Sequence, residues 1–153
     1  MTAQTPFLEM TDLTISVRLR GGGRGNVVDR VSLNIPAGGT VGLVGESGSG
    51  KTMTSLAIMG LLPPGARVES GEIRLGGENL LSKTPQDMQR IRGKKVAMVM
   101  QDAMTALNPC FTIRGQLAPS LRQHRHLAGA VLEDAVVNSL EQVHLPAPLL
   151  GKF

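Results

Sequence analysis

One short segment, residues 45–52, carries the clearest chemical pattern of the chain. It reads "GESGSGKT" and matches G-x-x-x-x-G-K-[ST] at every fixed position. A loop of this kind surrounds phosphate groups with backbone N–H groups when it joins a strand to a helix. The pattern predicts that a nucleotide is held by Gly45, Glu46, Ser47, Gly48, Ser49, Gly50, Lys51 and Thr52.

Each residue type has a physical reason at its position. The three glycines allow the tight turn that points successive N–H groups at an anion. Lys51 is expected to neutralise the β- and γ-phosphates, and the Thr52 hydroxyl to be a ligand of Mg²⁺. A helix starting near Lys51 adds the positive end of its dipole. The cofactors predicted from the segment are therefore ATP, or another nucleoside triphosphate, and Mg²⁺.

Two other interpretations of the segment are weaker. A dinucleotide-binding loop needs a third glycine three positions after Gly50, and that position is Met53. A plain Gly/Ser turn would not require a buried strand before it and an amphipathic helix after it. The nucleoside triphosphate site remains the preferred interpretation.

The elements that would position the loop can be read from the periodicity. Residues 7–17 and 27–35 alternate as strands, with a glycine-rich hairpin or flexible loop between them. Residues 40–45 read as a short buried strand, followed by a helix from Lys51 that Pro63 and Pro64 would stop.

The second half of the chain is read in the same way. Thr84 and Pro85 predict the start of a short helix over 84–92. Residues 96–100 read as a buried strand, and 128–144 as a helix. Pro119 is expected to interrupt the helical segment before that.

Composition limits the class of protein. The chain has 153 residues, one domain's worth, with 41% apolar and 18% charged residues, so it is globular. Three Phe and no Trp or Tyr leave the core to Leu, Val, Ile, Met and Ala. With a net charge of +4, nucleic acid has to be considered as a partner. Because the basic residues are scattered and lack stacking aromatics, no nucleic-acid surface is expected.

Cysteine, histidine and hydropathy add little chemistry. Cys110 is the single cysteine, which excludes an internal disulfide and fits a reducing compartment. His124, His126 and His144 lack a ligand cluster and are interpreted as solvated. No apolar run approaches 18 residues, so we expect a soluble chain or one docked to a membrane through a partner.

Three long segments resemble the ATP-binding subunit of ABC transporters, above all the dipeptide, oligopeptide and nickel importers. They read "DRVSLNIPAGGTVGLVGESGSGKTMTSLAIMGLLPP", "SGEIRLGGENLL" and "VAMVMQDAMTALNP". The resemblance implies an α/β fold, the P-loop NTPase core of ABC ATPases with an N-terminal antiparallel β subdomain and the start of a helical subdomain. It places the nucleotide-binding core at 1–100 and the Q-loop with the beginning of the helical subdomain at 101–153.

The resemblance also assigns Gln101 and Val17. Gln101 matches the family's Q-loop glutamine, which reaches Mg²⁺ and the attacking water and whose loop touches the membrane subunit. Val17 matches the position where the family carries an aromatic residue that stacks on adenine. Base–aromatic stacking is worth about 1–3 kcal/mol, so an aliphatic residue there is expected to weaken ATP binding.

By resemblance the chain is part of an ABC-type ATPase at the cytoplasmic face of a bacterial membrane. The expected partners are a second ATPase subunit, transmembrane permease subunits and, indirectly, a solute-binding protein. The chain ends at Phe153, before the family's signature motif, Walker B aspartate, catalytic glutamate and switch histidine. It is therefore expected to be inactive alone. The alternatives are a truncated remnant that binds nucleotide without hydrolysis, and a soluble ABC protein that acts on nucleic acid.

Overall fold

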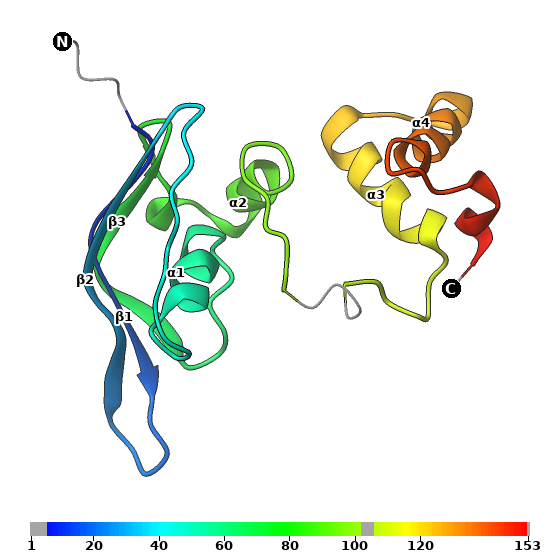
Figure 1. Cartoon of the computed structure of the whole chain (residues 1–153). Helices are drawn as coiled ribbons and strands as arrows, with labels where there is room; N and C mark the ends of the chain where they lie inside the picture. Colours follow the sequence, from blue (N-terminus) through cyan, green and yellow to red (C-terminus); the bar gives the residue numbers. More distant parts are fainter. Residues whose placement is uncertain (1–5, 102–105, 153) are drawn as a thin grey trace. The chain divides into compact units, whose positions relative to one another are not determined.

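The computed structural model describes residues 6–101 and 106–152. The chain divides into two compact units, Met1–Arg92 and Gly93–Phe153 (Figure 1). Each unit has buried side chains of its own. The functional division expected after residue 100 stays a prediction.

The first unit is built on an antiparallel sheet of four strands in the order β2-β1-β3-β4. The strands are β1 (Pro6–Arg18), β2 (Arg24–Pro36), β3 (Ala66–Leu75) and the short β4 (Glu78–Asn79). The two strands predicted over 7–17 and 27–35 are confirmed as β1 and β2. The glycine-rich segment between them forms the hairpin tip, in which the Leu19 N–H donates to the Gly23 carbonyl over 3.2 Å.

The pairing of β1 with β3 is interrupted by a bulge. The register shifts between Thr11 and Thr14, and Asp12 takes a positive φ of 47°. Opposite this bulge, Gly71 has φ +96°, and a Cβ atom on it would lie 2.6 Å from the carbonyl oxygens of Thr11 and Asp12. Only glycine fits so close an approach of two backbones.

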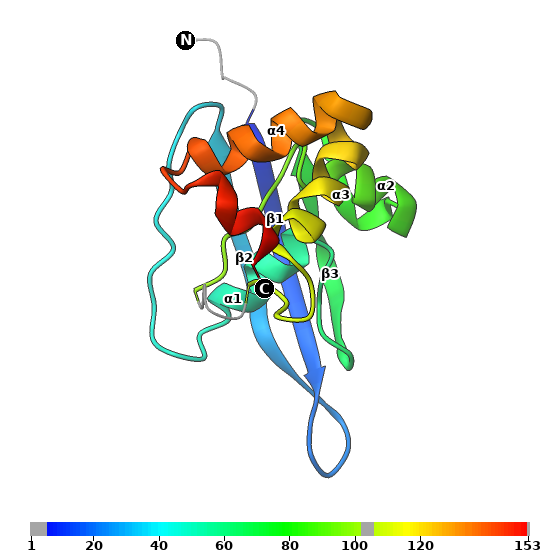
Figure 2. The same cartoon turned by 90° about the vertical axis from the view of Figure 1, so that its right-hand side faces the viewer.

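Helices α1 (Lys51–Ile58) and α2 (Pro85–Ile91) lie on the same side of this sheet (Figures 1 and 2). The apolar residues buried in this unit are all aliphatic or methionine, as the composition predicts. They are Leu8, Met10, Leu13, Ile15, Val28, Ala57, Met59, Ile73, Leu75, Leu80, Met88 and Ile91.

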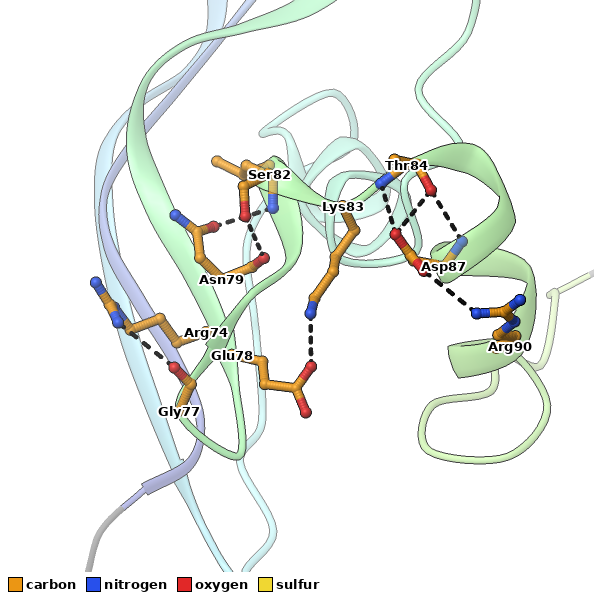
Figure 3. A network of polar contacts seen from close by, with 10 residues as sticks. Arg74, Gly77, Glu78, Asn79, Ser82, Lys83, Thr84, Asp87 and Arg90 are labelled. Atoms are coloured by element: carbon orange, nitrogen blue, oxygen red, sulfur yellow. Dashed lines mark hydrogen bonds and ion pairs between the residues drawn. The ribbon is translucent and has the colours of Figure 1, made fainter.

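The short helix α2 depends on side-chain caps at its N-terminus. The Thr84 hydroxyl accepts from the Asp87 N–H at 3.2 Å, and the Asp87 carboxylate accepts from the Thr84 N–H at 3.4 Å (Figure 3). This capping box, with Pro85 in the first turn, confirms the helix start predicted from the sequence. Just before it, Lys83 donates to Glu78 over 2.6 Å and ties the connection to β4.

The strands predicted at 40–45 and 96–100 are wrong. Both segments are extended or irregular, and neither pairs with another strand among the described residues. Most of their apolar side chains are exposed, Val44 to 93% and Val99 to 96%, and Val96 and Met98 are half-buried. Strands of this length need a hydrogen-bonded neighbour, and the described part of the chain supplies none to either.

The second unit is helical, with α3 (Ile113–Arg125), α4 (Gly129–Glu141) and the 3-10 helix η3 (Ala147–Gly151). The helix predicted over 128–144 is confirmed as α4. The core contains Ala118, Leu132 and Val136, with Leu117, Leu121, Leu127 and Leu150 packed against it.

The predicted break at Pro119 is wrong, because α3 continues through that residue. A proline inside a helix costs about 3 kcal/mol. Packing of the neighbouring Ala118 against α4 and the ion pair between Arg114 and Glu133 oppose that cost.

In neither unit is any described helix both long and apolar enough to span a bilayer.

Candidate nucleotide-binding site

The loop 45–50 ends in a glycine that packs directly on the sheet. Gly50 is the N-cap of α1 with φ 89°, a conformation that other residues adopt only with strain. A Cβ atom there would lie 2.5 Å from the Val27 carbonyl oxygen and 2.9 Å from Cγ2 of Val28. The glycine at this place in the motif is therefore required by the contact with β2, which fixes where α1 begins.

The first turn of α1 offers unpaired backbone donors. The first intrahelical bond runs from the Thr54 N–H to the Gly50 carbonyl at 2.8 Å, so the N–H groups of residues 51–53 have no acceptor within the helix. The N-cap glycine has no side chain that could accept from them, and the first turn contains no acidic residue. These donors and the positive end of the helix dipole suit an anion.

Lys51 lies within the loop that it is predicted to serve. Its Nζ atom donates to the carbonyl oxygens of Gly45 and Glu46, both at 2.7 Å, and to Oγ of Ser49 at 3.2 Å. The fold thus brings three of the predicted residues around the ammonium group of a fourth. Because an ammonium has only three donors, a phosphate that binds Lys51 must replace some of these contacts.

The Thr52 hydroxyl lies in the first turn of α1, and its side chain is exposed. Ser47 and Gly48 are exposed as well, and Gly48 has φ +83°. The loop and the first turn therefore offer N–H groups, one ammonium and exposed hydroxyls, among them that of Thr52. These groups match what triphosphate oxygens and Mg²⁺ require.

Val17 and Gln101 are the two residues assigned by resemblance. Val17 is half-buried in β1, between Gly25 on β2 and Ala66 on β3. Gln101 is exposed, lies in a bend and belongs to the second unit. Residues 102–105, which follow it in the quoted motif, are outside the described residues. The roles of Val17 and Gln101 stay predictions.

The sequence interpretation missed the way α1 ends. The Leu61 N–H donates to the Leu56 carbonyl at 2.8 Å, and the Gly60 N–H donates to the Ala57 carbonyl at 3.0 Å. This is a Schellman motif, with Gly60 at φ +61°. The helix stops here, before the two prolines expected to stop it. The isolated glycine after an apolar helical segment could have predicted this helix end.

A polar network on the sheet was also missed. Nε of Arg24 donates to Oγ of Ser16 at 2.7 Å and to the Glu69 carboxylate at 3.1 Å. Arg67 donates to the same carboxylate at 2.9 Å, and so does the Ser16 hydroxyl. The hydrogen bond from Arg67, supported by the one from Ser16, lowers the pKa of Glu69 from its usual 4.5 to about 2. Arg24 thus joins β2 to β1 and β3 through its side chain.

No group of three or more His, Cys, Asp or Glu side chains in the described residues could hold a metal ion. A resident metal centre built from those ligands therefore has no support in the described part of the chain. The binding of Mg²⁺ by Thr52 and Gln101 stays a prediction.

The comparisons with known proteins agree on one family. The family model described as ABC transporter matches residues 28–148. The oligopeptide transport ATP-binding protein OppD of Bacillus subtilis is 38% identical over 97% of this chain and 41% of its own length. The dipeptide transport ATP-binding protein DppD of Escherichia coli is 38% identical over 79% of this chain and 37% of its own. The chain thus spans less than half the length of these relatives.

The fold is found in solved structures as well. The dimeric structure of a post-hydrolysis state of the ATP-binding cassette MJ0796, bound to ADP and Pi, superposes with a TM-score of 0.78 at 20% identity. The match covers 95% of this chain and 60% of that one. The fold is that of an ABC ATPase cassette, with the antiparallel strands first and the helices after them. With the family model over most of its residues and the GxxxxGK[ST] loop at the start of α1, the chain belongs to the ABC transporter family as an ATP-binding protein.

Proposed function

We propose that this chain provides the nucleotide-binding loop of an ABC importer, which couples ATP binding and hydrolysis to uptake of peptides, nickel or a similar solute. The observation that carries the proposal is the site at the start of α1. There, unpaired N–H groups, the Lys51 ammonium and the Thr52 hydroxyl gather beside Gly50. The names of OppD and DppD, which refer to oligopeptide and dipeptide transport, support peptides as the solute.

The residues of the loop would act by binding and orienting the triphosphate. Lys51 would exchange its contacts with Gly45 and Glu46 for phosphate oxygens, an exchange of neutral acceptors for charged ones. The N–H groups of residues 51–53 would hold the oxygens at the positive end of α1. The hydroxyl of Thr52 would hold Mg²⁺, which when bound neutralises charge on the β- and γ-phosphates.

The remaining assignments of the whole transporter are also proposals. Gln101 would contact Mg²⁺ and the attacking water, because an amide can accept through its oxygen and donate through its nitrogen. Val17 would give adenine an aliphatic contact. The partners would be a second ATPase subunit, permease subunits and, indirectly, a solute-binding protein, at the cytoplasmic face of the membrane. The dimeric MJ0796 cassette supports the ATPase partner.

A second candidate function is nucleotide binding without hydrolysis. The hydrogen bonds of the loop come from backbone groups, Lys51 and Ser49, and the only acidic residue in the loop, Glu46, takes part through its carbonyl. Without a side-chain base beside the phosphates, the chain on its own would bind Mg-ATP and turn it over slowly. Measurement of both binding and phosphate release by this chain distinguishes the two functions.

The test of the site is Lys51→Ala, compared with Lys94→Ala. A hydrogen bond between charged groups contributes about 1.5–3 kcal/mol, so the Kd for Mg-ATP should rise about 10- to 150-fold. Titration calorimetry measures this, and far-UV circular dichroism checks that the variant is folded. Lys94 is an exposed lysine of the second unit, and its substitution should leave the Kd unchanged. Equal affinity of Lys51→Ala and the parent chain would refute the phosphate site.

A further inference from the structure

The C-terminal end of α1 is held by a side chain from outside the helix. Nε of Arg92 donates to the Met59 carbonyl at 2.7 Å, and Nη2 of Arg92 donates to the Gly60 carbonyl at 2.9 Å. Arg92 is the C-cap of α2 and the last residue of the first unit. One planar guanidinium thus joins the end of α2 to the two residues that follow α1.

The end of α1 needs this cation for an electrostatic reason. Its last turn contains no basic residue, so nothing within the helix balances the negative end of the dipole. The Schellman bonds use the carbonyls of Leu56 and Ala57 and leave those of Met59 and Gly60 to other donors. A fork of two donors with a permanent charge satisfies both carbonyls at once.

The space for the guanidinium comes from the absence of a side chain at Gly60. A Cβ atom there would lie 3.1 Å from Nη2 of Arg92 and 3.3 Å from Cε of Met88. The conformation that ends α1 and the space that admits Arg92 therefore depend on the same glycine. Gly60 thus both ends α1 and leaves the space in which Arg92 binds.

The opposite end of this helix carries the phosphate site. The helix has only eight residues, about 12 Å of rise, so a shift of its C-terminal end is transmitted to Lys51 and Thr52. The helix packs through buried Thr54 and Ala57 and through half-buried Met53, Leu56 and Ile58. The bonds from Arg92 hold the far end directly, beside the buried Met59.

We propose that Arg92 is a positioning residue for the phosphate site: by holding the C-terminal end of α1, it sets where Lys51 and Thr52 meet the nucleotide. This role rests on the proposed function, since it needs a nucleotide at the loop. Arg92 touches neither the loop nor the phosphates and acts through the helix.

The deciding measurement is the nucleotide affinity of Arg92→Met, which keeps the bulk of the stem and removes the fork and the charge. The Kd values for Mg-ATP and for Mg-ADP should both rise about fivefold or more, because both nucleotides place a β-phosphate at the start of α1. Calorimetric titrations of the whole chain, run well below the unfolding temperature, give these values. Arg92→Lys, with charge but no fork, should fall between the parent chain and Arg92→Met.

Two matched variants separate positioning from general loss of stability. Arg90→Met removes an exposed arginine of the same helix, whose ion pair with Asp87 lies within α2. Thr84→Ala removes the capping box of α2 and lowers the stability of that helix without touching α1. Both should keep the parent Kd, and Thr84→Ala should still show a lower melting temperature.

The outcomes are distinct. If the parent chain does not bind Mg-ATP, the proposed function fails, and the role of Arg92 fails with it. If the parent chain binds and Arg92→Met binds equally well, the role of Arg92 alone is refuted. An equal rise of the Kd for Mg-ATP in Arg92→Met and Thr84→Ala would also refute the role of Arg92, because the rise would then reflect only the lower stability of both variants. Should Arg92→Met not fold, parent-like affinity of Arg92→Lys would be the refuting result.

Discussion

The folded sheet stabilises the ionised carboxylate of Glu69 through hydrogen bonds. Its carboxylate accepts hydrogen bonds from side chains on all three long strands of the sheet: Ser16 on β1, Arg24 on β2 and Arg67 on β3. The hydrogen bond from Arg67, then that from Ser16, lowers the pKa of Glu69 from 4.5 to about 2. The folded chain thus favours the ionised form more than the unfolded chain does.

The sign of the pH effect follows from that direction. A carboxyl group whose pKa is depressed by folding stabilises the fold above its unfolded pKa, and this contribution is lost as the pH falls toward the folded pKa. The window for Glu69 runs from about pH 4.5 down to about pH 2. At neutral pH the contribution is fully present.

Glu69→Gln should therefore change how stability depends on acid. The parent chain should lose its advantage in unfolding free energy over Glu69→Gln steadily between pH 5 and pH 2, because the amide cannot be protonated in that range. Urea denaturation followed by circular dichroism at several pH values measures the difference. Asp134→Asn, at an exposed carboxylate on α4, is the control. Parallel acid curves for the parent chain and Glu69→Gln would contradict the prediction.

At the scale of the elements, the sheet depends on the close approach of β1 and β3 at Gly71. The bulge at Asp12 brings the backbone of β1 to within 2.6 Å of the place where a side chain on Gly71 would begin. Backbone atoms, unlike the end of a long side chain, cannot move away without breaking the ladder. A sequence pattern shows the glycine but not the strand that lies against it.

Gly71→Ala should destabilise the first unit by roughly 3 kcal/mol or more, since strain at φ +96° and the backbone clash both act. Gly77→Ala is the matched control. Gly77 also has positive φ, at +83°, but no atom lies within 4 Å of an added Cβ, so only strain of about 1–2 kcal/mol is expected. Urea unfolding of both variants measures the difference. Similar losses for the two would show that the close approach does not contribute.

Local signals decided which elements the sequence could predict. The caps at Thr84 and the alternation of β1 and β2 are local, and both predictions are confirmed. The segments 40–45 and 96–100 have the composition of strands, but a strand also needs a neighbour, which is a property of distant residues. The helix break predicted at Pro119 was wrong for the opposite reason, because packing of α3 outweighed the local effect of the proline.

In the candidate site, too, the features made by neighbouring residues could be predicted and those made by distant residues could not. The loop 45–52 could be predicted because its residues are consecutive, and in the structure Lys51 donates to the carbonyl oxygens of Gly45 and Glu46. Phosphate binding by the loop stays a prediction. The contacts of Arg92 with Met59 and Gly60 link residues more than thirty positions apart, which single-sequence patterns do not reveal. The roles of Val17 and Gln101 rest on resemblance alone.

At the scale of the whole molecule, the proposal for Gln101 concerns work done by an assembled transporter. In the full-length protein assembled with its permease subunits, Gln101→Ala should reduce transport-coupled ATP turnover about 10²-fold and change the Kd for Mg-ATP much less. The reason is that the amide would act on the attacking water and on coupling, while Lys51 and the N–H groups of α1 would bind the phosphates. Phosphate release and nucleotide titration in reconstituted vesicles measure the two quantities.

The matched variant for that experiment is Gln123→Ala, at an exposed glutamine on α3. It should leave both turnover and affinity unchanged. A larger effect of Gln101→Ala on affinity than on turnover would contradict the assigned role and would place Gln101 among the binding groups.

The turn before α3 has a practical consequence. Cys110 is exposed and is the only thiol of the chain. Its N–H donates to the Asn108 side chain at 2.9 Å, and the Gln116 amide donates to the carbonyl oxygens of Asn108 at 3.0 Å and of Phe111 at 2.9 Å. A maleimide dye would therefore attach at one defined place on an anchored turn. Fluorescence from the parent sequence, with no cysteine added or removed, can then report how the second unit responds when nucleotide binds to the first.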